Sequence, residues 1–180
     1  MYNTKLIGIS GCTNGGKTTL SKSLQKEFIS STFLTQDDYY FPRDSDHLEF
    51  ISELNSFNFD VISAIDVDKF FYELIDIKNS GKYELIFLDG FLLFEDERVY
   101  KMLDKKYFLF LNKQECWLRR ISRNYKTADT PNYFDKCVWP EYLKYKEKCD
   151  KKYDDIIYID GSRSISDIFN FVSNEIKSLI

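Results

Sequence analysis

The sequence predicts a single α/β domain over residues 1–180, built as a three-layer fold around a parallel β-sheet. Five short apolar runs recur along the chain, helical patterns separate them, and a glycine-rich loop follows the first run. The runs are rich in Ile, Leu and Phe and mostly lack polar alternation, as expected for strands covered on both faces. Strands that alternate with helices form parallel sheets with right-handed crossovers. The expected strands are 5–10, 31–35, 83–89, 106–111 and 155–160.

The first helices have clear sequence signals. After the glycine-rich loop, Leu20, Leu24 and Phe28 recur at i, i+4 and i+8, which places them on one face of an amphipathic helix. Further along, Asp60 is expected to cap a helix that runs through DVDKFFYELIDIKNSG. Gly81 is expected to end that helix.

Three later helices are predicted from residues that favour helix starts. Asn112 with Glu115 forms a variant of the capping box, and Ser164 with Asp167 predicts a cap for the last helix. Pro140 suits the first turn of a helix through EYLKYKEKC, where an amide proton is not needed. The chain shows no internal repeat, low-complexity tract or linker, so we expect no second domain.

The composition narrows the class of protein. With 43% apolar and 30% charged residues, the chain has the composition of a soluble globular protein. Its net charge of −4 argues against sequence-independent nucleic-acid binding, which depends on Lys and Arg facing phosphates. The N-terminus lacks a signal-peptide pattern, and the longest apolar stretch, 85–94, is far shorter than a membrane span. We therefore expect a cytoplasmic protein that binds neither nucleic acid nor membranes.

Cysteine and histidine content argues against a structural zinc site. The four cysteines, at positions 12, 116, 137 and 149, are widely spaced, and His47 is the only histidine. Free thiols in a reducing compartment are the simplest interpretation.

The stretch GISGCTNGGKTTL predicts a phosphate-binding loop. Its Gly11, Gly16, Lys17 and Thr18 fit the pattern G-x-x-x-x-G-K-[ST]. Because a strand precedes the loop and a helix opens inside it, the helix N-terminus can supply amides and a favourable dipole to a phosphate. Lys17 would reach the β- and γ-phosphates of a bound nucleotide, and the Thr18 hydroxyl would bind Mg²⁺.

Two strand ends offer carboxylates to this loop. The strand 83–89 ends in Asp89, the arrangement of a Walker B acid beside the metal, although an acid can also simply cap a strand. Asp37 and Asp38 follow the strand 31–35, at the sheet edge where ligands of parallel α/β proteins bind. One of them can point inward as the general base for a hydroxyl acceptor, and the alternative is turn chemistry or solvated charge.

Three arginines lie on the helix predicted after 106–111. Arg119 and Arg123 share a face at i, i+4, and Arg120 adjoins Arg123 at i, i+3. Such a stripe is often only a solvated helix face. Beside a phosphate-binding loop it also lets arginines reach a transferring phosphoryl group.

Further motifs accompany the loop: QDDYYFP, FDVISAID, LDGFLLF, RRISRNY, TPNYFDKCVWPEYLKY and IIYIDGSRS. With them, nearly the whole chain resembles the nicotinamide riboside kinases, relatives of uridine kinase. The resemblance implies a P-loop nucleoside-kinase-like fold with a five-stranded parallel sheet and a helical lid at about residues 119–132. It also implies ATP- and Mg²⁺-dependent phosphorylation of the riboside 5′-hydroxyl to nicotinamide mononucleotide, for NAD salvage.

The resemblance also implies how the acceptor is bound. Asp37 would contact the 5′-hydroxyl as the base, and Asp60, helped by Arg120, would bind the ribose diol. A pyridinium sandwiched by Tyr40 and Tyr125 would gain cation–π energy on the order of 1–2 kcal/mol when desolvated. Phe59 would lie alongside.

The residues expected to bind ATP combine the loop, two arginines and a later segment similar to one that packs on adenine. They are Gly11, Asn14, Gly15, Gly16, Lys17, Thr18, Thr19, Arg119, Arg123, Gly161, Ser162 and Arg163. Lys17, Asp37 and Asp89 are the expected catalytic residues, and Thr18, Asp37 and Asp89 are expected at Mg²⁺.

The chain departs from the family pattern at three positions. Asp89 stands where family members have Glu, so direct metal contact there would become water-mediated, and Tyr40 and Phe59 exchange the expected Phe and Tyr. Another nucleoside kinase, such as uridine kinase, is the alternative in the same class. A non-catalytic nucleotide-binding switch or interaction protein is the alternative in another class. We expect a monomer or weak homodimer, and the choice between ATP and GTP stays open.

Overall fold

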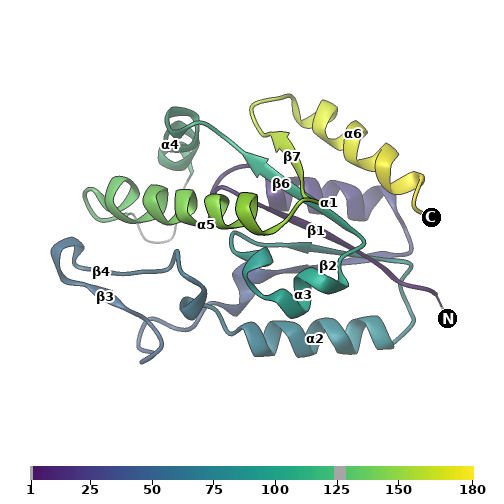
Figure 1. Cartoon of the computed structure of the whole chain (residues 1–180), viewed down its shortest axis with the longest axis horizontal. Coiled ribbons are helices and arrows are strands. Elements are labelled where there is room, and N and C mark those ends of the chain that lie inside the picture. Colours follow the sequence, from purple (N-terminus) through teal and green to yellow (C-terminus); the bar gives the residue numbers. More distant parts are fainter. Residues whose placement is uncertain (1, 124–128) are drawn as a thin grey trace.

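The computed structural model describes residues 2–123 and 129–180, and its centre is a five-stranded parallel sheet (Figure 1). The strand order is β2-β5-β1-β6-β7, so both neighbours of β1 come from later in the chain. All five strands predicted from the sequence are confirmed. Their bounds are Lys5–Gly11 for β1, Ser31–Thr35 for β2, Leu85–Asp89 for β5, Lys105–Phe110 for β6 and Ile157–Asp160 for β7.

Helices cover both faces of the sheet and complete the three layers (Figure 1). On one face, α1 (Lys17–Glu27) and α6 (Ile165–Lys177) pack their apolar residues on alternate side chains of the strands. On the other face lie α2 (Val67–Asn79), α3 (Glu97–Met102) and α5 (Trp139–Lys152). The central strand illustrates the alternation, because Leu6 joins one apolar cluster and Ile7 the other.

Most of the predicted helix ends are confirmed. The Asn112 side chain accepts a hydrogen bond from the Glu115 amide (2.8 Å), where α4 (Lys113–Ser122) begins. The Ser164 hydroxyl accepts one from the Asp167 amide (3.1 Å) at the start of α6. Pro140 lies in the first turn of α5, and Gly81, with φ of 62°, follows the end of α2.

The cap predicted for α2 is wrong. Asp66, not Asp60, caps this helix, and its carboxylate accepts a hydrogen bond from the Lys69 amide (3.0 Å). Asp60 is held six residues earlier, where its amide donates to Asn58 Oδ1 (3.0 Å) and a 3₁₀ turn over Ile62–Ala64 follows. The Asp60 carboxylate therefore does not cap a helix and instead lines the cleft described below.

Two features of the fold had no sequence signal. A short hairpin joins β3 (Phe50–Ile51) to β4 (Ser56–Phe57), strands of two residues that are too short to show alternation. A π-helical turn, Phe134–Val138, leads directly into α5.

The helical lid expected at about 119–132 is not confirmed. Helix α4 ends at Ser122, Arg123 has extended backbone angles, and residues 129–132 are not helical. Arg123 therefore lies just beyond the helix on which the sequence placed it.

The described cysteines are all buried and free. Within residues 2–123 and 129–180, no helix combines the length and apolarity needed to cross a membrane.

Candidate active site

The glycine-rich loop connects the end of β1 to the start of α1 and has the backbone of a phosphate cradle. Gly11 has φ of 125°, and a Cβ there would lie 2.0 Å from the Leu109 carbonyl oxygen, so only glycine fits. Gly16, with φ of 95°, is the N-cap of α1. The Lys17 ammonium donates to the carbonyl oxygens of Gly11 (3.1 Å) and Cys12 (2.8 Å). The loop thus holds a positive charge at a helix N-terminus, an arrangement suited to phosphate.

The sheet register brings Asp89 to this loop. Asp89 pairs with Ile9 of β1 on one side and with Thr35 of β2 on the other. Only 1% of the residue is exposed, and its Oδ2 atom has no hydrogen-bond partner among residues 2–123 and 129–180. Burial raises the pKa of the Asp89 carboxyl, while the Thr35 and Thr18 hydroxyls and the Lys17 charge oppose that rise.

An unpartnered buried carboxylate oxygen beside Thr18 and Lys17 fits the outer coordination shell of Mg²⁺. This ion usually keeps several waters and takes one or two carboxylates together with substrate phosphates. Among the described residues, no group of three or more His, Cys, Asp or Glu side chains could hold a metal by itself. The fit therefore depends on a nucleotide that supplies further oxygens.

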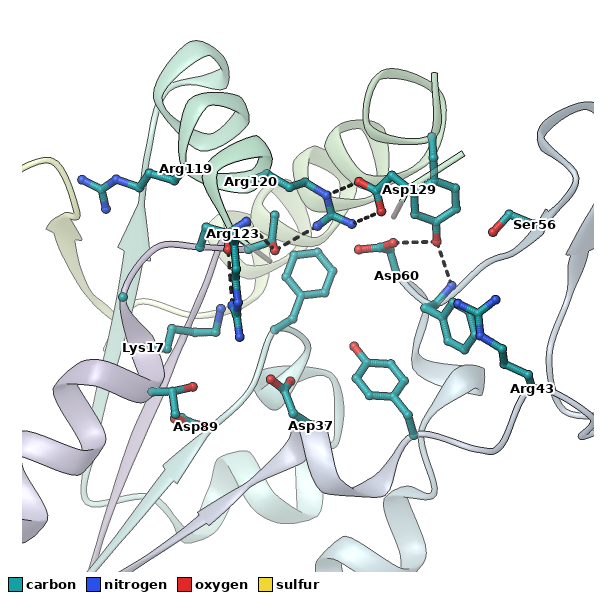
Figure 2. Close-up of a pocket in the computed structure, with 18 of the residues that line it drawn as sticks. Lys17, Asp37, Arg43, Ser56, Asp60, Asp89, Arg119, Arg120, Arg123 and Asp129 are labelled. Carbon is teal, nitrogen blue, oxygen red and sulfur yellow. Dashed lines mark hydrogen bonds and ion pairs between the residues drawn. The ribbon is translucent and has the colours of Figure 1, made fainter. Parts of the chain in front are cut away.

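Of the two aspartates that follow β2, Asp37 and not Asp38 faces the cleft that begins at the phosphate-binding loop. Thr35 accepts a hydrogen bond from the Asp37 amide (3.4 Å) and starts the 3₁₀ turn Gln36–Tyr39. Asp37 lines the cleft, whereas Asp38 does not. Gln36 points the other way, is buried, and accepts a hydrogen bond from the Leu92 amide (3.0 Å) through its side-chain oxygen. Asp37 thus lies in the cleft beside Asp89 (Figure 2).

A cleft of about 960 Å³ runs from the cradle to the small hairpin (Figure 2). Lys17 and Asp89 lie at one end, Asp37 lies between, and Asp60 and Asp129 lie toward the other end. The residues predicted from the sequence that line it are Asn14, Gly16, Lys17, Thr18, Thr19, Asp37, Tyr40, Phe59, Asp60, Asp89, Arg119, Arg120 and Arg123. A single cavity therefore joins the predicted donor and acceptor sites.

Some predicted site residues do not line this cleft. Gly11 and Gly15 shape the loop from behind, and Gly161 packs against it, since a Cβ on Gly161 would lie 3.2 Å from the Gly15 carbonyl oxygen. Ser162 and Arg163 follow Gly161 outside the cleft. Tyr125 lies outside the described residues.

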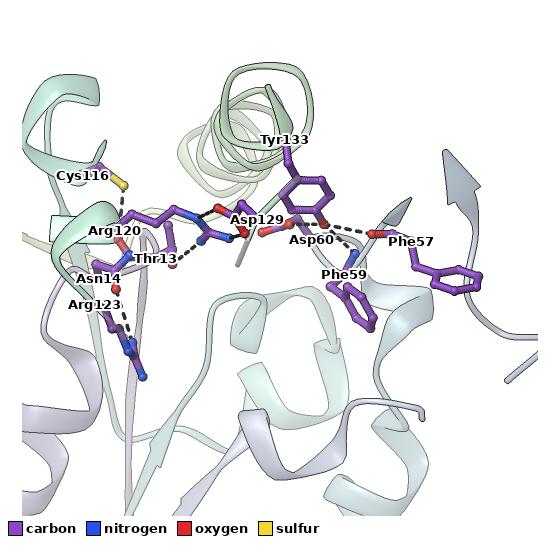
Figure 3. A network of polar contacts seen from close by, with 10 residues as sticks. All are labelled: Thr13, Asn14, Phe57, Phe59, Asp60, Cys116, Arg120, Arg123, Asp129 and Tyr133. Carbon is purple, nitrogen blue, oxygen red and sulfur yellow. Dashed lines mark hydrogen bonds and ion pairs between the residues drawn. The ribbon is translucent and has the colours of Figure 1, made fainter. Parts of the chain in front are cut away.

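A polar network organises the end of the cleft that contains Asp60 (Figure 3). The Tyr133 hydroxyl accepts a hydrogen bond from the Phe59 amide (3.1 Å) and donates to either the Asp60 carboxylate (3.0 Å) or the Phe57 carbonyl (3.1 Å). Burial raises the pKa of Asp60 to about 6, against the charge of Arg120 and the Tyr133 hydrogen bond, which lower it. Asp60 is thus a carboxylate that ionises near neutral pH and faces a cavity.

Comparison with known proteins identifies the family of the chain. Nicotinamide riboside kinase 1 of Rattus norvegicus is 33% identical, in an alignment that covers 97% of this chain and 94% of that protein. The chain belongs to the nicotinamide riboside kinase family. Uridine kinase of Staphylococcus epidermidis is more distant, at 27% identity over 100% of this chain and 99% of its own. No family model matches the chain.

Solved structures support the fold of this nicotinamide riboside kinase family member. A sugar kinase from Janibacter sp. HTCC2649 superimposes with a TM-score of 0.64 at 13% identity, over 97% of this chain and 95% of that one. At that identity the likeness concerns the fold alone, and it agrees with the P-loop kinase architecture expected from the sequence.

The arginines of this family member differ in their surroundings. Arg119 pairs with Glu115 (2.8 Å), at the outer edge of the cleft. Arg123 donates to Asn14 of the cradle (3.3 Å) and extends toward Lys17 in Figure 2. Of the three, Arg123 therefore lies nearest the expected phosphates.

Arg120 connects the cradle to the acceptor end. Its guanidinium binds both carboxylate oxygens of Asp129 (2.5 and 2.9 Å) and donates to the Thr13 hydroxyl (3.1 Å). Such a bidentate pair fixes the plane of the guanidinium. Arg120 is thereby held between the loop and Asp60 (Figure 3).

Sequence reasoning missed several residues of the site. Asp129 and Tyr133 belong to the segment around TPNYFD, which supported the resemblance, but neither had been given a role. Arg43 also lines the cleft and had no signal beyond its place after QDDYYFP. Tyr133 contacts Asp60, which is 73 positions away, whereas Asp129 pairs with Arg120, nine positions away.

Proposed function

We propose that this protein transfers the γ-phosphoryl group of ATP to the 5′-hydroxyl of nicotinamide riboside, giving nicotinamide mononucleotide and ADP in NAD salvage. One observation supports this most strongly: a phosphate cradle and a carboxylate suited to a ribose diol occupy opposite ends of one cleft, with Asp37 between them. The relatives named nicotinamide riboside kinase, similar over nearly the whole chain, support the choice of acceptor.

In the proposed reaction, Asp37 accepts the proton of the 5′-hydroxyl as the oxygen attacks the γ-phosphorus. The bond from that phosphorus to the β,γ-bridging oxygen breaks, and ADP leaves with the electron pair. Lys17 and Arg123 stabilise the charge on the transferring group from the cradle side. The rate enhancement comes from positioning and charge neutralisation rather than from a covalent intermediate on the enzyme.

Mg²⁺ would be held by the Thr18 hydroxyl and nucleotide oxygens, with Asp89 acting through a water. At that position Mg²⁺ would supply positive charge that offsets the negative charge of the nucleotide phosphates. The unpartnered Oδ2 atom of Asp89 supports this water-mediated role. Gly161, Ser162 and Arg163 are proposed to contact the adenine from beside the cradle.

The acceptor would be held by Asp60 and by aromatic rings. Since the pKa of Asp60 is about 6, its carboxylate is ionised at pH 7.5 and can accept hydrogen bonds from both ribose hydroxyls. The Tyr40 and Phe59 rings lie edge to face, with centroids 6.1 Å apart, and present an aromatic surface to the base. Tyr125 is proposed to complete the sandwich around a pyridinium.

A panel of nucleosides with ATP and Mg²⁺, ranked by kcat/KM, tests the proposal. We expect nicotinamide riboside to be used far better than uridine, and a 2′-deoxyriboside to lose most activity because Asp60 loses a partner. ADP formation without any nucleoside measures background, and the Lys17→Met variant is the negative control. A preference for uridine would support the alternative nucleoside kinase, and ATP turnover that ignores every nucleoside would refute a kinase of this class.

Within this proposal the protein acts on small molecules in the cytoplasm, as a monomer or weak homodimer. It would have no nucleic-acid or membrane partner. Gel filtration with light scattering tests the oligomeric state.

A further inference from the structure

Arg43 places a positive charge at the acceptor end of the cleft. Its guanidinium carbon lies 5.4 Å from the centre of the Phe59 ring, a cation–π distance. Arg43 lines the same cleft as Asn55 and Ser56. Figure 2 shows Arg43 and Ser56 at the far end from Lys17, beyond Asp60. The charge therefore lies on the aromatic surface proposed to hold the nucleoside base.

Among the described residues, the charge of Arg43 contacts the Phe59 ring and no acidic side chain. In the described part of the chain, no ion pair joins Arg43 to an acid, and its side chain is exposed. Asp44 and Asp46 are close in sequence but do not line the cleft. The guanidinium is thus available to a ligand that reaches Phe59.

A guanidinium stacked on Phe59 treats two kinds of base differently. A second cation, such as a pyridinium with a neutral carboxamide, competes for the same π face and is repelled by the like charge. A base that also carries a carboxylate can meet the planar fork of the guanidinium with two hydrogen bonds. Whether the charge of Arg43 favours or opposes binding of a nucleoside therefore depends on the substituent of its base.

We propose that Arg43 is a specificity-determining residue that favours nucleosides whose base carries a carboxylate, above all a pyridinium riboside with a 3-carboxylate in place of the 3-carboxamide. This inference rests on the proposed function, since it refines the acceptor of the same site. It predicts that the carboxylate riboside is used at least as well as the carboxamide riboside by the unmodified protein.

The test is a competition assay. Both ribosides are mixed at equal concentration with ATP and Mg²⁺, and the two mononucleotides are separated and quantified at low conversion. Their ratio gives the ratio of kcat/KM directly and is independent of the fraction of folded enzyme. The proteins compared are the unmodified chain, Arg43→Gln, Arg43→Glu and Arg43→Lys. Lys26→Gln, an equal charge change on the exposed face of α1 and outside the cleft, is the matched control.

We expect Arg43→Gln to lower the carboxylate-to-carboxamide ratio by about three- to tenfold, in the range of a partly exposed charge-assisted contact. Arg43→Glu should lower it further, Arg43→Lys should keep part of the preference, and Lys26→Gln should leave the ratio unchanged. A ratio that changes less than twofold in both Arg43→Gln and Arg43→Glu would overturn the proposal. So would an equal drop in the Lys26→Gln control.

A second pair of acceptors separates this inference from the proposed function. If the unmodified protein phosphorylates uridine but neither pyridine riboside, the proposed function fails. The role of Arg43 is then decided by uridine against 5-carboxyuridine, with the same variants and the same expected direction. Phosphorylation of no nucleoside at all would refute both proposals.

Discussion

Replacing Asp60 with asparagine should stabilise the folded protein at neutral pH while it removes most activity on ribosides. Burial raises the Asp60 pKa to about 6, against 3.8 for a free aspartate. That difference corresponds to roughly 3 kcal/mol of free energy that opposes the charged form in the folded state. Because part of the side chain remains open to the cleft, we discount this value to about 1–2 kcal/mol.

The sign of the effect follows from linkage. A carboxyl with a raised pKa in the folded state contributes stability below the unfolded pKa of 3.8 and loses it as the pH rises through about 6. At pH 7.5 the wild-type protein therefore bears the full cost of the buried charge, and the Asp60→Asn variant does not. For a chain of 180 residues, about 1–2 kcal/mol corresponds to an increase in Tm of about 2–8 °C.

Differential scanning calorimetry of the ligand-free proteins at pH 7.5 and pH 5 measures this effect. The advantage of Asp60→Asn should be largest at pH 7.5 and shrink at pH 5, where wild-type Asp60 takes up a proton. Asp129→Asn, which loses the ion pair with Arg120, should instead lower Tm at pH 7.5 and provides a contrast of opposite sign. An Asp60→Asn variant that melts below wild type at pH 7.5, or whose difference from wild type is the same at both pH values, would refute the reasoning.

Asp60→Asn should also lower kcat/KM for ribosides by the equivalent of about 2–4 kcal/mol, because the ribose diol then lacks its charged hydrogen-bond acceptor. The gain in stability and the loss of activity would together identify Asp60 as a functional group kept at a cost to the fold. Equal use of riboside and 2′-deoxyriboside by the wild-type protein would contradict the diol assignment.

Four further predictions concern other residues of the cleft. Lys17→Met should lower kcat by several orders of magnitude with an unchanged circular dichroism spectrum, because charge neutralisation at the cradle is lost. Asp37→Asn should lower kcat roughly 10²–10⁴-fold as a lost general base. Asp89→Asn should instead weaken the Mg²⁺ dependence of the initial rate, and Asp89→Glu should be tolerated. Tyr133→Phe should raise the Asp60 pKa, since its hydrogen bond lowers that pKa, and so move the acid limb of the kcat/KM profile for ribosides to higher pH.

Each of these has an outcome that contradicts it. Near-normal turnover by Lys17→Met would exclude the loop as the donor site. If Asp89→Asn leaves both the rate and the Mg²⁺ requirement unchanged, Asp89 is only a strand end, and if Asp37→Asn is harmless, the base is elsewhere. An unchanged acid limb in Tyr133→Phe would mean that its hydroxyl does not act on Asp60.

The sequence alone determined the elements whose causes are local. The five strands followed from short apolar runs, and the cradle followed from glycines at fixed offsets, of which Gly11 is confirmed in a conformation that other residues rarely adopt. The caps at Asn112 and Ser164 were also predictable, because a capping side chain bonds to an amide three residues away.

Local signals failed where several residues could play the same part. Asp60, Asp66 and Asp68 all precede the apolar pattern of α2, and each could cap a helix. The choice fell to Asp66 because Asn58 holds the Asp60 backbone and Tyr133 contacts its carboxylate. Only the folded chain contains that competition.

The partners within the cleft were decided by tertiary structure. Tyr133 and Asp60 are 73 positions apart, and Arg120 and Thr13 are 107 apart. No period or short motif links such pairs, because their contact depends on the order of strands in the sheet and on the path of the chain between them. The sequence determined which groups could bind phosphate. The packing of distant segments decided that the Asp60 carboxylate faces the cleft beside the Tyr133 ring, and that the charge of Arg43 is available to a substrate.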